Sequence, residues 1–426
     1  MAHRVSTIAA HVAASSALAP SPVSASMGAI GKQSPEDVVV VSALRTPIGR
    51  AKKGHFKDTM PDDLLKAALE GVVKQSGIDP KLVGDVVVGN VQLGGAYAGP
   101  ARMAQLRAGF PCDVPLFAVN RQCSSGLQAV ANVANAIRGG MIDVGIGAGV
   151  ESMTQGGAPG GGTPPPVNLN ELMANKLAKD CLVPMGVTAE NVAERYGISR
   201  EDQDKMGVES HKKALAAQAA GRFKAEIVPV PVTVTDEKGT EKTVIVDADD
   251  GPRATTMDGL AKLKTVFKKE GGTVTAGTAS QVSDGAAAVL LMSRAKASQL
   301  GLKPLAVYRG AKVCGCEPDE MGVGPAVAIP ALLEASKLKI DDIDVFEINE
   351  AFAAQALYCV RKLGVPEAKL NPNGGAIALG HPLGATGARQ VATLVNELNS
   401  SKKKLGVISM CIGTGMGMAA LFEAES

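Results

Sequence analysis

Hydrophobic positions along the chain alternate between short continuous runs and longer segments with helical spacing. Residues 37–41 and 85–90 are runs rich in Val, as expected for strands buried on both faces of a sheet. The apolar positions of residues 64–75 recur at helical spacing and predict a helix. Further along, residues 125–138 favour a helix of small side chains, and residues 143–149 favour another strand. Strands that alternate with helices in this way predict an α/β fold.

The last third of the chain repeats this order. Helices are predicted at residues 330–337 and 387–399, and strands at residues 345–349 and 405–410. We therefore expect two halves with one topology, related by an internal pseudo-repeat.

The segment between the halves has a different character. It begins with a run of Gly and Pro at residues 156–166, which predicts an extended or flexible crossing. Residues 188–196 and 200–220 have helical patterns, and the Val-rich residues 224–242 are typical of a hairpin. We interpret this segment as an insertion of the kind that often covers an active site. The predicted division of the chain is 1–35 (leader), 36–155 (first half, completed by about 281–300), 156–280 (inserted loop domain) and 301–426 (second half).

The first 35 residues form a leader that is rich in Ala and Ser and contains no acidic residue. Such a stretch buries too little apolar surface to fold alone. Within it, Arg4-Val5, five further residues and His11-Val12 resemble the amino-terminal address read by the peroxisomal import receptor. The alternatives are a flexible tail on a cytoplasmic protein or a transit peptide for another organelle. We predict a peroxisomal protein that the import receptor recognises.

Composition narrows the function classes. Apolar residues make up 46% and charged residues 20% of the chain, as in ordinary globular proteins. A formal net charge of +2 is too small to indicate nucleic-acid binding. No apolar run approaches the roughly 18 residues of a membrane span. The 7 cysteines are odd in number and scattered, which favours free thiols in a reducing compartment, and Cys314 and Cys316 lack the neighbours of a zinc site.

One of the 5 histidines stands in a rigid frame of glycine and proline. His381 lies in Gly380-His381-Pro-Leu-Gly384, just before a predicted helix, where such residues shape a turn and let a ligand approach. An isolated histidine is more often structural than catalytic, but this frame favours a catalytic role. The other histidines fall in the leader, in a polar loop or, as His211 does, on a polar helix.

Cys123 is the best candidate nucleophile. It lies in Asn120-Arg-Gln-Cys123-Ser-Ser-Gly126, immediately before a predicted helix. The N–H groups at a helix start stabilise a thiolate and can hold a developing oxyanion. A buried structural cysteine is the alternative, and the polar neighbours argue against burial in an apolar core.

Two further residues occupy predicted strand ends, where ligands of open α/β sheets collect. Cys411 enters the glycine loop Cys411-Ile-Gly-Thr-Gly415, and a second thiol there can shuttle protons. The rival interpretation, a dinucleotide fingerprint, lacks the helix and acidic residue that should follow. Asn349 begins Asn349-Glu-Ala-Phe352, and either caps a helix or binds a ligand or water.

Together these four motifs resemble those of the thiolase family, and the closest likeness is to peroxisomal 3-ketoacyl-CoA thiolases. The resemblance runs from about Val38 to Phe422, with supporting stretches at Gly149-Val-Glu-Ser-Met153 and Gln281-Val-Ser-Asp-Gly285. It implies two halves in αβαβα layers with an inserted loop domain over the CoA site, assembled as a homodimer or tetramer. It also implies no cofactor, because coenzyme A is a substrate.

By this resemblance Cys123 is the acyl-carrying nucleophile, His381 the base that activates it and Cys411 the second acid/base. Asn349, through a water, and His381 bind one thioester oxygen. The N–H groups of Cys123 and Gly413 form a second oxyanion hole.

For CoA, the resemblance assigns Ser280 to the pantetheine arm and Arg253 to the nucleotide end, with Met185 also at the CoA site. Pro184 stands where some acetoacetyl-specific members carry His, which favours substrates longer than acetoacetyl-CoA. Cys181, in the inserted segment, raises the further hypothesis of a reversible Cys123–Cys181 disulfide.

The predicted activity is thiolysis of 3-ketoacyl-CoA, an acetyl-CoA C-acyltransferase reaction. A biosynthetic acetoacetyl-CoA thiolase is the alternative. A decarboxylating ketoacyl synthase is a second alternative. Such enzymes pair the cysteine with two His or with His and Asn, whereas this chain has Cys411 in the remaining place. A non-enzymatic carrier on this fold should have lost Cys123, His381 or Cys411.

Overall fold

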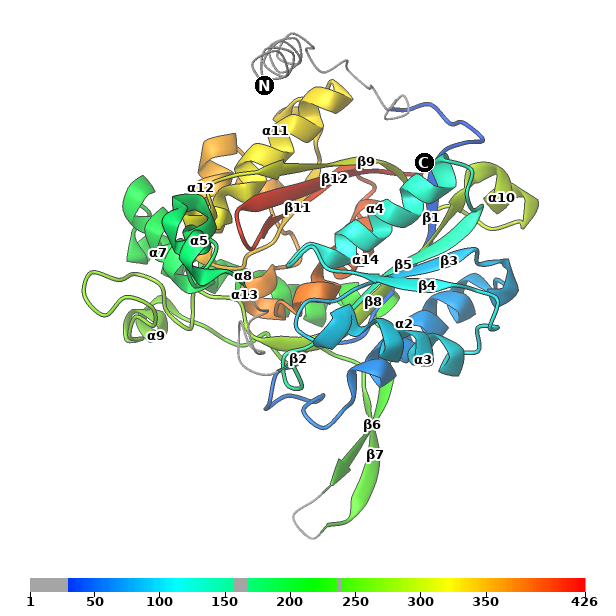
Figure 1. Cartoon of the computed structure of the whole chain (residues 1–426), viewed down its shortest axis with the longest axis horizontal. Helices are drawn as coiled ribbons and strands as arrows, with labels where there is room; N and C mark the ends of the chain where they lie inside the picture. The colour runs from blue at the N-terminus through cyan, green and yellow to red at the C-terminus, as the bar shows by residue number, and fades with distance from the viewer. Residues whose placement is uncertain (1–29, 157–166, 236–238, 426) are drawn as a thin grey trace, which may run out of the picture.

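The computed structural model of the protein describes residues 30–156, 167–235 and 239–425. Helix and sheet layers alternate across the molecule (Figure 1). Helices α4 (Ser125–Arg138) and α14 (Leu383–Ser400) lie in the middle, between strands of the first half on one side and of the second half on the other. The expected α/β architecture of αβαβα layers is confirmed.

The first half contributes strands in the order β4-β3-β5-β8-β1, and the short β2 pairs with β8. β3 is parallel to both β4 and β5, whereas β8 is antiparallel to its neighbours. The strands are β1 (Val38–Arg45), β2 (Gly49–Arg50), β3 (Asp85–Gly89), β4 (Leu116–Val119), β5 (Val144–Ser152) and β8 (Ser283–Ser293). The other helices of this half are α2 (Pro61–Ser76), α3 (Ala98–Arg107) and α10 (Arg294–Gln299).

The second half continues the sheet in the order β10-β11-β12-β9. Leu370 forms a parallel bridge with Phe346 on β10, in the place that β4 takes beside β3. The two halves therefore share one strand order, as the predicted pseudo-repeat requires. The strands are β9 (Ala306–Gly315), β10 (Val345–Ile348), β11 (Leu405–Ile412) and β12 (Met416–Ala424), and the remaining helices are α11 (Gly324–Ser336), α12 (Ala353–Leu363) and α13 (Ala376–Leu379).

The halves are joined at their edges and through the central helices. β1 and β9 pair over two residues, which links all the described strands of both halves into one ten-stranded sheet. A Cβ atom at Gly126 would lie 2.8 Å from the backbone nitrogen of Ala388, and one at Gly387 would lie 2.2 Å from that of Leu127. The two helices thus touch backbone to backbone near their first turns, which requires glycine at both positions. This contact brings together the chain segments just before each helix.

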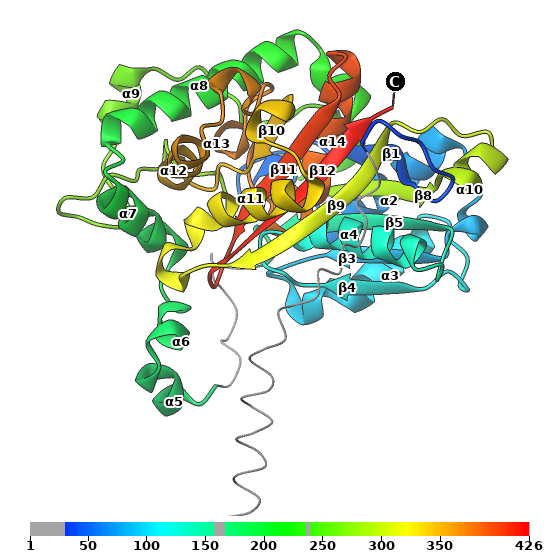
Figure 2. The same cartoon turned by 90° about the horizontal axis from the view of Figure 1, so that it is seen from above.

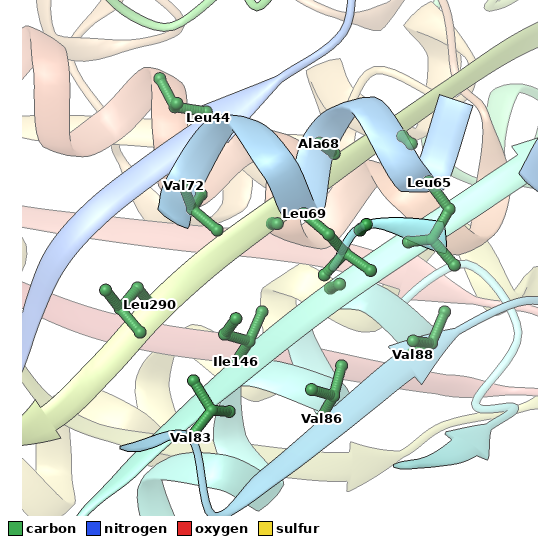
Figure 3. Close-up of a cluster of buried hydrophobic side chains, with 14 of the residues drawn as sticks. Leu44, Leu65, Ala68, Leu69, Val72, Val83, Val86, Val88, Ile146 and Leu290 are labelled. Atoms are coloured by element: carbon green, nitrogen blue, oxygen red, sulfur yellow. The ribbon is translucent and has the colours of Figure 1, made fainter. Parts of the chain in front are cut away.

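The apolar faces that the sequence pattern predicts do form the core. On α2, Leu65, Leu69 and Val72 point onto the strands of the first half (Figure 3). Their partners include Ile146 on β5 and Leu290 on β8. Burial of this face stabilises the layer by roughly 1.5–3 kcal/mol for each large side chain.

One helix boundary was predicted wrongly. The helix expected at residues 330–337 begins at Gly324 and contains Pro330 in its interior. Pro325, in the first turn, is at a position that favours helix starts, whereas Pro330 removes one internal hydrogen bond. Ile329 and Leu332 on either side of Pro330 are fully buried against the second half, and this packing keeps the helix continuous.

The segment between β5 and β8 contains α5 (Leu169–Ala174), α6 (Lys176–Asp180), α7 (Met185–Tyr196), α8 (Arg200–Ala219) and α9 (Met257–Ala261). The predicted hairpin is present as β6 (Val230–Thr235) and β7 (Glu241–Val246), which projects from the body (Figure 1). Helices α7 and α8 lie beside α12 of the second half, on the opposite side from α2 and α3 (Figure 2). No helix in residues 30–156, 167–235 and 239–425 is long and apolar enough to cross a membrane.

Candidate active site

Cys123 lies two residues before α4 and only 3% of its surface is exposed. Its thiol packs in an apolar cluster with Ala51, Met153 and Leu383. The expectation that polar neighbours would keep it out of apolar surroundings is therefore wrong. The neighbouring Asn120 is exposed, whereas Ser124 and Ser125 are buried with the thiol and satisfy their hydroxyls on the backbone carbonyls of residues 121 and 122. Met153 and Leu383 come from the two halves, and Cys123 sits where they meet.

Burial raises the pKa of the Cys123 thiol to about 11. Two backbone N–H groups, of Gly413 and of Cys123 itself, face the sulfur and act in the opposite direction. The sequence had suggested that the helix start stabilises a thiolate. In the structure, desolvation of the sulfur outweighs this stabilisation. At neutral pH the protein therefore holds a neutral thiol, with two N–H donors that face the sulfur.

Cys411 lies near the end of β11 and is fully buried with Met321 and Ala351. Burial raises its pKa well above the ordinary value, and the proximity of Cys123 raises it further. Met185, at the start of α7, packs against both the Cys123 cluster and the Cys411 cluster. The structure thus brings the two thiols, from opposite halves, to one place.

Both ring nitrogens of His381 have hydrogen-bond partners. The hydroxyl of Thr386 donates to the carbonyl of Pro382 at 3.1 Å, and its oxygen lies 2.7 Å from His381 Nδ1. With the hydroxyl proton directed at that carbonyl, the matching tautomer carries its hydrogen on Nδ1 and donates it to Thr386. Nε2 is therefore unprotonated and accepts from Nδ2 of Asn349 at 3.2 Å. His381 and Asn349 are brought together as predicted, and Asn349 Oδ1 is buried without a partner.

Burial, assisted by the positive charge of Arg389, lowers the pKa of His381 to about 3. The imidazole is therefore neutral at physiological pH and its Nε2 can take a proton. His381 is two residues before Leu383, which packs on Cys123, so the base and the thiol belong to the same small region.

The predicted CoA residues lie on segments around this region. The N–H of Ser280 donates to the carbonyl of Ala351 at 2.9 Å, so the chain at Ser280 runs beside the segment that follows Asn349. Arg253 is exposed, and partial desolvation and the charge of nearby Arg50 lower its pKa. Two arginines so close to each other can bind a polyanion.

His211 lies on the polar helix α8, as predicted, but its side chain is buried and its Nδ1 accepts the N–H of Arg253 at 3.4 Å. Burial lowers its pKa to about 4. The exposed Lys212 beside it is compatible with this burial, because successive residues of a helix point in different directions.

Sequence reasoning assigned no role to two buried acids beside the site. Glu151 ends β5 within the stretch Gly149-Val-Glu-Ser-Met153, and Glu350 directly follows Asn349. Glu350 accepts from Ser210 Oγ at 2.6 Å and from Asn371 Nδ2 at 2.8 Å, which ties the strand end of Asn349 to its neighbours. The sequence did contain a signal for these two residues, because an acidic residue at the end of an otherwise apolar strand is unusual.

Cys181 is exposed, and its sulfur lies 3.8 Å from the carbonyl oxygen of Thr414, next to Gly413. The hypothetical Cys123–Cys181 disulfide stays a prediction. Because Cys123 is buried, the segment that carries Cys181 would have to move before the two sulfurs could bond.

A two-half α/β fold with two buried thiols, a neutral histidine and N–H donors at one place defines a class: enzymes that transfer acyl groups through a cysteine. Comparison with known families agrees. Residues 38–295 match the family described as thiolase, N-terminal domain, and residues 302–424 match thiolase, C-terminal domain. The chain belongs to the thiolase family.

Among curated relatives, the chain is 57% identical over 430 residues to rat peroxisomal 3-ketoacyl-CoA thiolase B, covering 99% of both chains. It is 57% identical over 391 residues to the human peroxisomal 3-ketoacyl-CoA thiolase, covering 91% of each. Among solved structures, the dimeric peroxisomal thiolase of Saccharomyces cerevisiae superposes with a TM-score of 0.85 at 49% identity, covering 92% of this chain and 99% of that one. Human mitochondrial 3-ketoacyl-CoA thiolase in complex with CoA gives 0.81 at 38% identity, covering 92% and 98%.

Proposed function

We propose that the protein cleaves 3-ketoacyl-CoA with free CoA to acetyl-CoA and a shortened acyl-CoA, the last step of fatty acid beta-oxidation. The observation that carries the chemistry is the meeting of two buried thiols, Cys123 and Cys411, from opposite halves. One thiol can hold the acyl group while the other moves protons. The relatives named above favour this activity over the biosynthetic acetoacetyl-CoA alternative.

In the first half-reaction, Nε2 of His381 takes the proton of Cys123 as its sulfur attacks the 3-keto carbon. The carbon–carbon bond of the adduct breaks, its electron pair becomes the acetyl-CoA enolate, and Cys411 protonates the enolate carbon. Because both partners are neutral at rest, proton transfer accompanies attack. The N–H groups of Cys123 and Gly413, which face the sulfur, stabilise the negative charge that develops on the oxygen of the adduct.

In the second half-reaction, the Cys411 thiolate takes the proton of incoming CoA. The CoA thiolate attacks the acyl-Cys123 thioester, and the protonated His381 returns its proton to the Cys123 sulfur as it leaves. In the first half-reaction, the thioester oxygen of the acetyl-CoA unit accepts from the protonated Nε2 of His381 and from a water held by Asn349. Splitting the reaction through a covalent intermediate predicts ping-pong kinetics.

Intact-mass analysis tests the proposal directly. Mixing the protein with 3-ketooctanoyl-CoA in the absence of free CoA should add one hexanoyl group, located on Cys123 by peptide mapping. Addition of CoA should then remove the group. No adduct from this substrate or from acetoacetyl-CoA would exclude thiolysis and favour a carrier.

The inserted loop domain, residues 156–280, is proposed to cover the CoA site, with Arg253, Ser280 and Met185 as contacts. We expect Arg253→Ala to raise the KM for CoA by about tenfold, since a charge-assisted contact with phosphate is lost, and to change kcat little. Steady-state kinetics check this, with Arg361→Ala on α12 as the control for removal of an exposed arginine. A larger effect on kcat than on KM would place Arg253 elsewhere in the mechanism.

The two curated relatives named above, from rat and human, are peroxisomal, and so is this protein. Since the similar yeast thiolase is dimeric, we propose a homodimer. We also propose that the import receptor reads Arg4-Val5 and His11-Val12, which lie outside the described residues.

A fluorescent reporter carrying residues 1–35 is expected to enter peroxisomes, and the same reporter with Arg4→Ala to stay in the cytosol. Microscopy against a peroxisomal marker distinguishes the two. Import of the Arg4→Ala reporter at the parent level would show that another segment carries the address.

A further inference from the structure

Glu151 is fully buried at the end of β5, and no cation pairs with it among residues 30–156, 167–235 and 239–425. Its negative charge lies close enough to Cys123 to raise the pKa of that thiol. Met153, two residues further on, packs against Cys123. A buried carboxylate with no counter-charge is unfavourable unless hydrogen bonds replace the water it has lost.

Four N–H donors supply those hydrogen bonds. The backbone N–H groups of Val91 and Gly384 donate to Oε2, each at 3.0 Å, and that of Gln92 donates to Oε1 at 3.2 Å. The fourth donor is Nδ2 of Asn90, at 3.2 Å from Oε1. All four donors are neutral, and both carboxylate oxygens are used. Burial raises the pKa of Glu151 to about 7, and the same four donors oppose that rise.

The donors come from two segments that are distant in sequence. Asn90, Val91 and Gln92 form the loop after β3 in the first half, whereas Gly384 lies in the first turn of α14, which begins two residues after His381 in the second half. A Cβ atom at Gly384 would lie 2.6 Å from Cα of Asn90, so this turn is pressed directly onto the loop. The carboxylate of Glu151 therefore hydrogen-bonds the loop after β3 to the turn that follows His381, while Met153 on the same segment packs against Cys123.

We propose that Glu151 is a positioning residue of the active site, whose ionised side chain fixes the turn of His381 relative to Cys123. The proposal deepens the thiolase function proposed above and rests on it. A carboxylate is required because it only accepts hydrogen bonds, whereas a Gln amide would turn its own N–H groups toward at least some of the four donors. The charge has a second consequence. It adds to the larger effect of burial in disfavouring the Cys123 thiolate before substrate binds.

The experiment compares two rates in the full-length protein. One is thiolysis, measured as kcat and as KM for CoA. The other is alkylation of Cys123 by iodoacetamide at mildly alkaline pH, followed by mass spectrometry of the Cys123 peptide. The titratable groups around the sulfur are Glu151 on β5, Cys411 on β11 and His381 before α14, and only Glu151 is altered.

For Glu151→Gln we expect kcat to fall on the order of 10²-fold, because the His381 turn loses its fixed position, while KM for CoA stays within about threefold. Alkylation of Cys123 should become faster by about threefold or more, because the opposing charge is gone. Glu151→Asp keeps the charge but is shorter, so kcat should fall while alkylation stays at the parent rate. Glu334→Gln, an exposed acid on α11, is the matched control and should change neither rate.

A kcat of Glu151→Gln within twofold of the parent would overturn the proposal. So would a parallel loss of thiolysis and alkylation, which is what general disruption of the site produces. If Glu151→Gln does not fold, Asn90→Ala removes one donor and leaves the carboxylate. It should lower kcat by about five- to tenfold at unchanged KM, and unchanged kcat would also overturn the proposal. If the parent itself shows no thiolysis, the proposed function fails, whereas the alkylation rates still report on the charge of Glu151.

Discussion

Replacing Cys123 by alanine is expected to lower kcat for thiolysis by about 10⁵-fold or more, to the limit of detection. Removal of a nucleophile eliminates the covalent route, and the remaining groups then act only by binding and by stabilising charge. In this protein the N–H groups of Gly413 and Cys123 and the imidazole of His381 would remain, without an acyl acceptor between them. The variant should form no acyl adduct with 3-ketooctanoyl-CoA.

The fold should survive this change. The thiol is one small group in the cluster with Ala51, Met153 and Leu383, and its loss should cost on the order of 1 kcal/mol. The control is Cys112→Ala, which removes an exposed thiol from the same half and should leave kcat unchanged. Thermal unfolding of both variants measures the loss of stability, and a steady-state assay measures kcat. A Cys123→Ala protein that keeps more than about a hundredth of parental kcat would assign the acyl group to another residue.

Replacing His381 by alanine is expected to lower the rate of Cys123 acylation by about 10³- to 10⁴-fold. The thiol has a pKa near 11 and cannot supply enough thiolate unaided at neutral pH, so it depends on Nε2 as the proton acceptor. Rapid-quench mass spectrometry of the hexanoyl adduct measures this step without the second half-reaction. His55→Ala, in an exposed loop, is the control and should acylate at the parental rate. Acylation of His381→Ala within about tenfold of the parent would exclude His381 as the base.

The same histidine determines a pH dependence. A pKa lowered to about 3 means that the neutral, proton-accepting form persists as pH falls well below the ordinary histidine range. We therefore expect no loss of the first half-reaction from His381 protonation between about pH 8 and pH 5. A fall in acylation rate with a midpoint near the ordinary histidine pKa of about 6.5 that is also present in Glu151→Gln, which lacks the carboxyl with a pKa of about 7, would contradict the buried, neutral state of His381.

Much of the fold was accessible from periodicity. The helix at residues 125–138 was predicted with the bounds that α4 has, and β1, β3, β5, β10 and β11 all overlap predicted runs. These elements are strongly patterned because they are buried, so apolar spacing reports them directly. The start of α11 was missed because Pro330 was taken as a helix start, whereas tertiary packing holds that proline inside the helix.

The site was accessible in part. Cys123, His381, Cys411 and Asn349 stand out because glycine, proline and strand ends frame them. Their burial and protonation were not accessible, since local polarity suggested an open Cys123 with a stabilised thiolate. Desolvation depends on what covers a side chain, and the cover comes from Leu383, which is far away in sequence.

The sequence by itself determined the alternation of strands and helices, the repetition of that order and the residue types able to carry acyl transfer. These follow from the local spacing of apolar positions and from the identity of the side chains, and neither depends on distant contacts. Tertiary structure decided which groups meet and in which protonation state. It brought Cys123 and Cys411 close together from opposite halves, hydrogen-bonded the ring of His381 to Thr386, and placed Glu151 among four N–H donors. Close helix packing and the exclusion of water produce these effects, and both exist only once the chain has folded.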